Sequence, residues 1–175
     1  MKSIYSFTTD ELAALFSSGE MLDQARVDEC IRAIDVNPQD FIARLKLAGF
    51  CSPDFDNFKY EYFRHLLWFI DNYPDVPFED VLSPFRIVTS EKFCYTELFE
   101  SIRRHVELQP NNVKILVNAA YLCMHLDDPF AIICARKARD IAPTDPRVNL
   151  LVNRFSGLIK AWQNTGLSGH DYGPV

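Results

Sequence analysis

The chain is 175 residues long, with 48% hydrophobic and 24% charged residues, a composition typical of folded globular proteins. Its formal net charge of −6 argues against binding to the phosphates of DNA or RNA. No stretch approaches the roughly 18 consecutive apolar residues that a membrane span needs, and the N-terminus lacks an apolar run of signal-peptide length. We therefore expect a soluble, cytoplasmic protein that binds neither nucleic acid nor a membrane.

Charge is distributed unevenly along the chain. Residues 1–110 contain 11 Lys and Arg against 19 Asp and Glu, whereas residues 111–165 contain seven against four. The C-terminal part is therefore mildly basic, which favours a partner that presents acidic side chains or a carboxylate. Ordinary solvated helix faces would explain the same distribution without any partner.

Helical signals follow one another from the N-terminus to about residue 163. Thr8 and Glu11 have the spacing of a capping box, and Asp40 stands where it can cap a helix that begins at Phe41. Apolar residues recur at helical spacing between such signals. The first predicted helix begins at the signal in residues 8–11 and is ended by residues 17–19. The other predicted helices cover residues 21–36, 41–50, 58–72, about 91–108 and 147–163, with two more inside 113–143 and an irregular segment at 75–84.

The predicted helix at 58–72 is the most aromatic one. Tyr60, Tyr62, Phe63, Trp68 and Phe69 occupy more than one of its faces. A helix that is apolar nearly all round is usually buried on several sides, so this helix is expected at the centre of the core. The alternative is an exposed aromatic groove that grips apolar side chains of a partner.

The clearest pair of helices lies within residues 113–143. Small residues there stand among larger apolar ones, so two helix backbones can approach closely while the larger side chains fill the gaps. The second helix is expected to begin with an acidic cap followed by a proline in the first turn. The residues concerned are Ala119, Ala120, Ala131, Ala135 and Ala138 among Leu116, Leu122 and Ile132, and then Asp127, Asp128 and Pro129.

Prolines that end helices recur at a nearly constant interval. Pro38, Pro74, Pro110 and Pro143 are separated by 36, 36 and 33 residues. Similar segments precede them: CIRAIDVNP, LLWFIDNYP, SIRRHVELQP and CARKARDIAP. A fixed period in this range indicates stacked helical hairpins.

In these features the chain resembles the tetratricopeptide repeat family. Residues 113–143 match its pattern best, 41–74 match less well, and 77–110 keep only the second half. The family's glycine is replaced by Ala48 and Ala120, and its first-helix aromatic residue by Arg44 and Leu116. The matching positions are Leu116, Ala119 and Ala120 on the first helix, and Ala131, Ala135, Ala138 and Pro143 on the second.

We therefore predict an all-α fold of about nine helices, stacked as antiparallel hairpins in a right-handed, tetratricopeptide-like superhelix with an irregular middle. Residues 1–163 are expected to form one domain, and residues 164–175, with three glycines and one proline, a flexible tail. The segments LLWFIDNYP and VNAAYLCMHLDDP also resemble bacterial tetratricopeptide-like proteins of unassigned function, a resemblance that implies no activity.

Residues of the types that commonly act in catalysis or bind metals form no recognisable motif in this sequence. The five cysteines lack a CxxC pair and are predicted to be buried core residues in a reducing compartment. No HExxH motif, zinc spacing or glycine-rich phosphate loop occurs, so no metal, cofactor or catalytic residue is predicted. Glu61 and His65 share a helix face and are expected to form a surface ion pair. A hydrolase-like site would need both of them to converge with His105.

The resemblance also implies a set of partner-binding residues. In tetratricopeptide proteins the first helices of successive units line a concave groove, where polar and basic side chains hold a peptide or its carboxylate end. An Arg and a Lys beside an Asn suit a carboxylate, because the guanidinium donates two bonds and the amide orients the group. Carried over by position, the implied residues are Lys46, Lys114, Asn118, Tyr121, Arg147, Leu150 and Arg154.

The function expected from these observations is that of an adaptor or regulatory subunit that binds a protein or peptide partner in a concave groove. One alternative is an inhibitor of the immunity-protein type, which masks a basic site on one dedicated partner with its acidic half. The other alternative is the enzyme with a site near Glu61, His65 and His105. The residue pattern favours an interaction protein over an enzyme.

Overall fold

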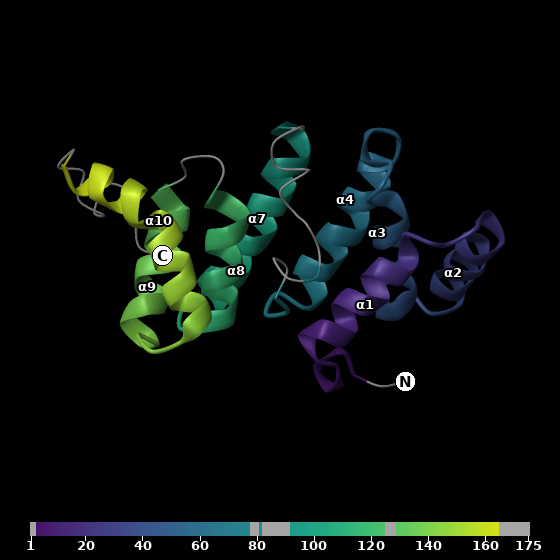
Figure 1. Ribbon diagram of the computed structural model, residues 1–175, viewed down its shortest axis with the longest axis horizontal. Helices are drawn as coiled ribbons and strands as arrows, with labels where there is room; N and C mark the ends of the chain where they lie inside the picture. The colour runs from purple at the N-terminus through teal and green to yellow at the C-terminus, as the bar shows by residue number, and fades with distance from the viewer. Residues whose placement is uncertain (1–2, 78–80, 82–91, 125–128, 165–175) are drawn as a thin grey trace. The chain divides into compact units, whose positions relative to one another are not determined.

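The computed structural model describes residues 3–77, 81, 92–124 and 129–164, and these ranges are helical apart from short connections (Figure 1). A 3-10 turn, Ile4–Ser6, precedes eight α-helices in the described ranges. The predicted all-α class is confirmed. The helices are α1 (Thr9–Gly19), α2 (Gln24–Val36), α3 (Phe41–Cys51), α4 (Phe55–Asn72), α7 (Lys92–Leu108), α8 (Val113–Cys123), α9 (Pro129–Ile141) and α10 (Pro146–Asn164).

Two compact units are formed by these helices. The first unit contains α1 to α4, and the second contains α7 to α10 together with the segment Tyr73–Val76. The sequence alone predicts one domain over residues 1–163. No helix within the described ranges is both long and apolar enough to cross a membrane.

Helix ends follow the local signals in the sequence. Thr8 accepts a hydrogen bond from the Glu11 amide while its own amide donates to the Glu11 carboxylate, so the predicted capping box is confirmed. Asp40 accepts from the Ala43 amide at the start of α3. Each of the four periodic prolines stands two residues beyond the last residue of a helix. These helix ends are determined by the nearby sequence, because the prolyl ring removes the N–H that would continue the helix.

Two helices begin three residues away from their predicted starts. α2 starts at Gln24 instead of 21, because Asp23 caps it by accepting from the Arg26 amide. α4 starts three residues before the predicted 58, and Phe58 itself has non-helical angles (φ −113°, ψ 19°) that kink the helix. The predicted acidic residues before Pro129, the cap at 89–91, the tail beyond 164 and most of the irregular segment at 75–84 lie outside the described residues.

In the first unit, α1 and α3 cross with their backbones in contact. A Cβ atom added to Gly19 would overlap the carbonyl oxygen of Lys46, and one added to Gly49 would overlap the carbonyl oxygen of Phe16. Both glycines are needed here for close approach and not for a special backbone angle. Helical periodicity places Lys46 and Gly49 on the face of α3 opposite Arg44 and Leu47. The face that bears Arg44 and Leu47 is therefore the one that packs against α2 and α4.

The aromatic helix α4 is buried on only part of its circumference. Tyr62, Phe63 and Phe69 lie in the core of the first unit, as predicted, and Trp68 is half-buried. Tyr60, however, is 55% exposed. The expectation of burial all round is therefore too broad, because α3 is the helix that packs extensively against α4 within this unit.

In the second unit, α8 is enclosed by α7, α9 and α10. Every residue from Ile115 to Cys123 is buried, so this helix forms the centre of its core. The small residues predicted to let α8 and α9 approach closely are all fully buried: Ala119, Ala120, Ala131, Ala135 and Ala138. Among the cysteines whose side chains are described, Cys51, Cys123 and Cys134 are buried and form no disulfide, and Cys30 is partly exposed.

One polar side chain in this core has a structural role. Asn118 is 1% exposed, and its Nδ2 donates to the carbonyl oxygens of Pro74 and Val76 at 2.7 and 2.6 Å. The segment that follows α4 is thereby held against α8. Because Pro74 and Val76 are themselves buried, their carbonyl groups need these donors in place of water.

We expect Gly49→Ala to lower the free energy of unfolding by about 2 kcal/mol or more, because the new methyl group must push α1 and α3 apart. This loss should outweigh the gain in helix propensity of about 1 kcal/mol. Urea unfolding followed by circular dichroism measures the change. Ser17→Ala, at an exposed position of α1, is the matched control and should be near neutral. Equal stability of Gly49→Ala and the wild type would contradict the backbone contact.

Asn118→Asp should destabilise the chain by about 3 kcal/mol, because a carboxylate oxygen replaces the NH2 group that donates both bonds, and this oxygen then faces two carbonyl oxygens. Asn153→Asp, at an exposed position of α10, serves as its control. Hydrogen exchange should show the loss of protection in α8 and not in α1. An Asn118→Asp chain with unchanged unfolding would show that the two bonds contribute nothing.

Candidate functional site

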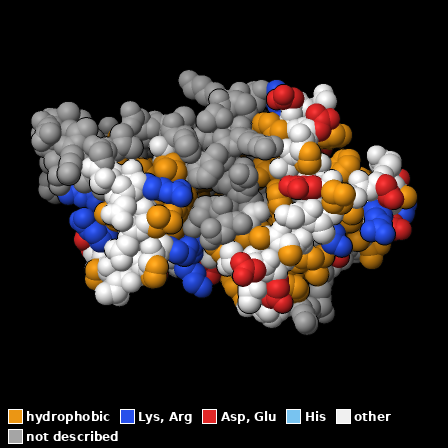
Figure 2. All heavy atoms as spheres, viewed as in Figure 1, with side chains coloured by type: hydrophobic (Ala, Val, Ile, Leu, Met, Phe, Trp, Pro, Cys, Tyr) orange, Lys and Arg blue, Asp and Glu red, His pale blue; other side chains and the backbone are white. Residues whose placement is uncertain are grey.

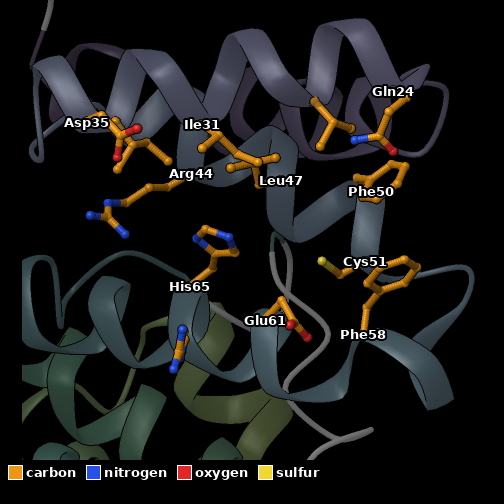
Figure 3. Close-up of a pocket in the computed structure, with 13 residues that line it drawn as sticks. Gln24, Ile31, Asp35, Arg44, Leu47, Phe50, Cys51, Phe58, Glu61 and His65 are labelled. Carbon is orange, nitrogen blue, oxygen red and sulfur yellow. The ribbon is translucent and has the colours of Figure 1, made fainter.

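A groove of about 440 Å³ lies in the first unit between α2 and α4, with α3 as its floor (Figure 3). Its volume falls within the range of ligand-binding sites in proteins. Apolar and charged side chains from all three helices line it: Gln24, Val27, Ile31, Ile34 and Asp35 of α2, Arg44, Leu47, Phe50 and Cys51 of α3, and Phe58, Glu61, Arg64 and His65 of α4.

The α2 wall is an apolar stripe with little cover. Val27, Ile31 and Ile34 recur at helical spacing, which turns them to the same face. Only Val27 is buried, and Ile31 remains 46% exposed. Apolar surface in such an arrangement gains free energy when another apolar group covers it.

The two ends of the groove differ in chemistry. Phe50, Phe58 and Cys51 lie together at one end, near Gln24 (Figure 3). Arg44 and Asp35 lie at the other end, and the His65 ring points into the groove from α4, between the two ends (Figure 3). The groove can therefore receive an apolar group at one end and a polar or charged group at the other.

Arg44 is the half-buried cation of this site. Its Nε donates to the carbonyl oxygen of Pro38 at 3.1 Å, and its Cζ lies 4.5 Å from the centre of the Trp68 ring. Burial lowers the pKa of Arg44, although an arginine stays protonated at neutral pH. Within the described residues, no carboxylate pairs with it: Asp35 and Glu61 line the same groove and form no ion pair with it.

His65 is neutral in the folded chain. Burial lowers its pKa from 6.5 to about 4, and the nearby charges of Arg44 and Arg64 act in the same direction. Its Nδ1 atom is buried and has no hydrogen-bond partner in the part of the chain that the structure describes. The predicted Glu61–His65 ion pair is absent, because a neutral imidazole offers no charge to the carboxylate and no hydrogen bond joins the two side chains.

The Cys51 thiol in the groove stays protonated. Burial raises its pKa to about 12, and the Glu61 carboxylate adds to the effect. A thiol is a weak nucleophile in this form, since the thiolate is the reactive species. His105, the third residue of the hydrolase alternative, belongs to the second unit, whereas Glu61 and His65 belong to the first. No cluster of three potential metal ligands occurs within the described ranges.

None of the seven residues implied by the family resemblance lines this groove. Lys46 is in the first unit and half-buried; the other six belong to the second. There, Lys114, Leu150 and Arg154 are exposed and Arg147 is half-buried, whereas Asn118 and Tyr121 are buried.

The structure does bring two of these residues together. The Arg154 guanidinium lies 5.4 Å from the centre of the Tyr121 ring, which joins α10 to α8. Asn118 instead uses both amide hydrogens on the segment at Pro74 and Val76, so a ligand would have to displace that segment to reach them. Lys and Arg side chains are prominent on the visible surface of the second unit, and Asp and Glu on that of the first (Figure 2).

Part of the groove was recognisable in the sequence. The apolar spacing of Val27, Ile31 and Ile34 was visible, but it is equally typical of a helix that packs into the core. Arg44 stood out only as a departure from the aromatic residue of the tetratricopeptide pattern. No pattern indicated that it stacks on Trp68, because the two residues come from different helices.

We expect the stability of the chain to fall as the pH is lowered from about 6.5 to about 4. In this window the unfolded chain protonates His65 while the folded chain does not, so acid favours unfolding. The loss should approach about 3 kcal/mol at the acid end. His65→Gln should remove this component, and urea unfolding at a series of pH values measures the difference between the two chains. An identical pH slope for both chains would show that His65 titrates normally.

Comparison with known proteins leaves this site to be interpreted from its own geometry. No protein-family model, no curated protein and no solved structure matches the chain.

Proposed function

We propose that this chain is a protein-binding module, an adaptor or regulatory subunit, that takes up a segment of its partner in the groove between α2 and α4. The observation that carries the proposal is the partly uncovered apolar lining of this groove, with Ile31 46% exposed beside Leu47 and Phe50. Two helices that flank an apolar floor suit the binding of an amphipathic segment.

The chemistry of the groove favours recognition over catalysis. Its thiol is protonated, and its imidazole is neutral with a pKa of about 4. A general base works best with a pKa near the working pH. Binding sites instead combine an apolar lining with a few polar groups that fix the orientation of the bound partner.

We also infer that the units are built from tetratricopeptide-like hairpins. The supporting observations are the four prolines two residues beyond α2, α4, α7 and α9, and the packing of α3 on α1, α2 and α4. In this interpretation α2 and α4 are second helices, so the groove lies on the second-helix side. The first-helix face, which in the second unit contains Lys114, Leu150 and Arg154, is the competing location for the partner.

Affinity purification with quantitative mass spectrometry tests the proposed function. Ile31→Asp should reduce recovery of a specific partner by about tenfold or more, because a charge then enters the apolar lining. Met21→Asp, at a position 86% exposed and outside the groove lining, is the matched control and should retain the partner. Circular dichroism checks that both variants fold.

Arg154→Glu distinguishes the two locations. Loss of the partner with Arg154→Glu and not with Ile31→Asp would place the binding site on the first-helix face and contradict the groove. A partner retained equally by all three variants, or the absence of any specific partner, would overturn the proposed function.

A further inference from the structure

We propose that the occupant of the groove between α2 and α4 is an amphipathic helix that packs an apolar side chain against the paired rings of Phe50 and Phe58, whose centres lie 5.4 Å apart, and places the carboxylate of an Asp or Glu on Arg44. The inference rests on the proposed protein-binding function and specifies the class of partner. It is based on two features that lie in one groove: an apolar end, and a half-buried cation that pairs with no carboxylate among the residues that the structure describes.

Arg44 is held in position for an incoming acid. Its Nε is committed to the Pro38 carbonyl oxygen, and one face of the guanidinium lies against Trp68. These contacts restrain the side chain and leave the donors of the two terminal nitrogens. Planar guanidinium donors match the two oxygens of a carboxylate, and a pre-positioned group loses less side-chain entropy on binding.

The other charged groups of the groove leave this role to Arg44. Asp35 and Glu61 are exposed and make no ion pair with it. Arg64 is exposed, so water screens its charge more strongly. His65 is neutral and adds no competing charge at neutral pH. A carboxylate that enters the groove would therefore pair with Arg44, which is less exposed than Arg64 and is held in position.

The length of the groove favours a helix over a chain terminus. Its lining on α2 extends from Gln24 to Asp35, which corresponds to about 16 Å of helix. On the floor, Arg44 and Phe50 are six residues apart, or about 9 Å along α3. On a bound helix, residues four or seven positions apart share a face and are separated by about 6 to 10 Å. One apolar and one acidic residue at that spacing would reach both ends.

Selection from random peptides tests the proposal with the full chain. One library displays random segments of about 16 residues, long enough to form a helix, followed by a fixed linker so that they have no free carboxyl terminus. A second library ends in the random segment. Binders are retained only if Ile31→Asp abolishes their binding and Met21→Asp does not, which restricts the set to the groove.

The expected result is that the first library yields groove binders with Asp or Glu four or seven positions from a large apolar residue. Arg44→Glu should no longer select these peptides. Groove binders without an acidic residue would overturn the inference and leave the proposed function standing, as would groove binders found only among free carboxyl termini. No groove binder from either library would contradict both.

Fluorescence anisotropy with a selected peptide then measures the pairing itself. Changing its acidic residue to the amide should weaken binding to the wild-type chain about tenfold or more, and binding to Arg44→Gln less than about twofold, because the paired cation is already gone. Arg64→Gln is the control and should still discriminate the two peptides. Arg44→Lys, which keeps the charge without the planar donors, should lose part of the discrimination and covers the case in which Arg44→Gln fails to fold. Discrimination that is the same with and without Arg44 would overturn the inference.

Discussion

The contact between the backbones of α1 and α3 is the constraint on which the first unit depends. Gly19 and Gly49 each stand where a side chain would overlap a carbonyl oxygen of the other helix. Because α1 occupies one face of α3 so closely, the opposite face, with Arg44 and Leu47, is the one that meets α2 and α4. The floor of the groove is thus a consequence of how tightly the other side of the same helix is packed.

Polar side chains have different roles in the two units. In the second unit, the buried amide of Asn118 is used on backbone carbonyl oxygens, and α8 is enclosed by its neighbours. In the first unit, Arg44 keeps donors toward a groove whose apolar wall is partly uncovered. Buried donors that are used within the fold stabilise it, whereas a pre-positioned charge beside uncovered apolar surface gains free energy from a partner. This difference is the physical reason why we propose that the first unit is the one that binds a partner.

Prediction from the sequence succeeded where the cause was local and was incomplete where the cause was distant. The capping box at Thr8, the cap at Asp40 and the proline helix ends were all found, because each depends on residues a few positions apart. The early start of α4 was missed because Phe58 interrupts its helical angles. Asn118 was assigned to a binding face, although its hydrogen-bond partners lie more than 40 residues earlier in the chain.

The sequence by itself determined the helical class, most helix boundaries and which residues share a helix face, since these follow from capping, proline chemistry and a fixed periodicity. Only the tertiary structure decided what each face meets. Asn118 turned inward to a backbone segment, Ile31 remained partly exposed, and Arg44 stacked on Trp68 at the end of a groove. The reason is that an apolar stripe specifies burial without specifying its partner, which is selected by the shapes of helices distant in the sequence.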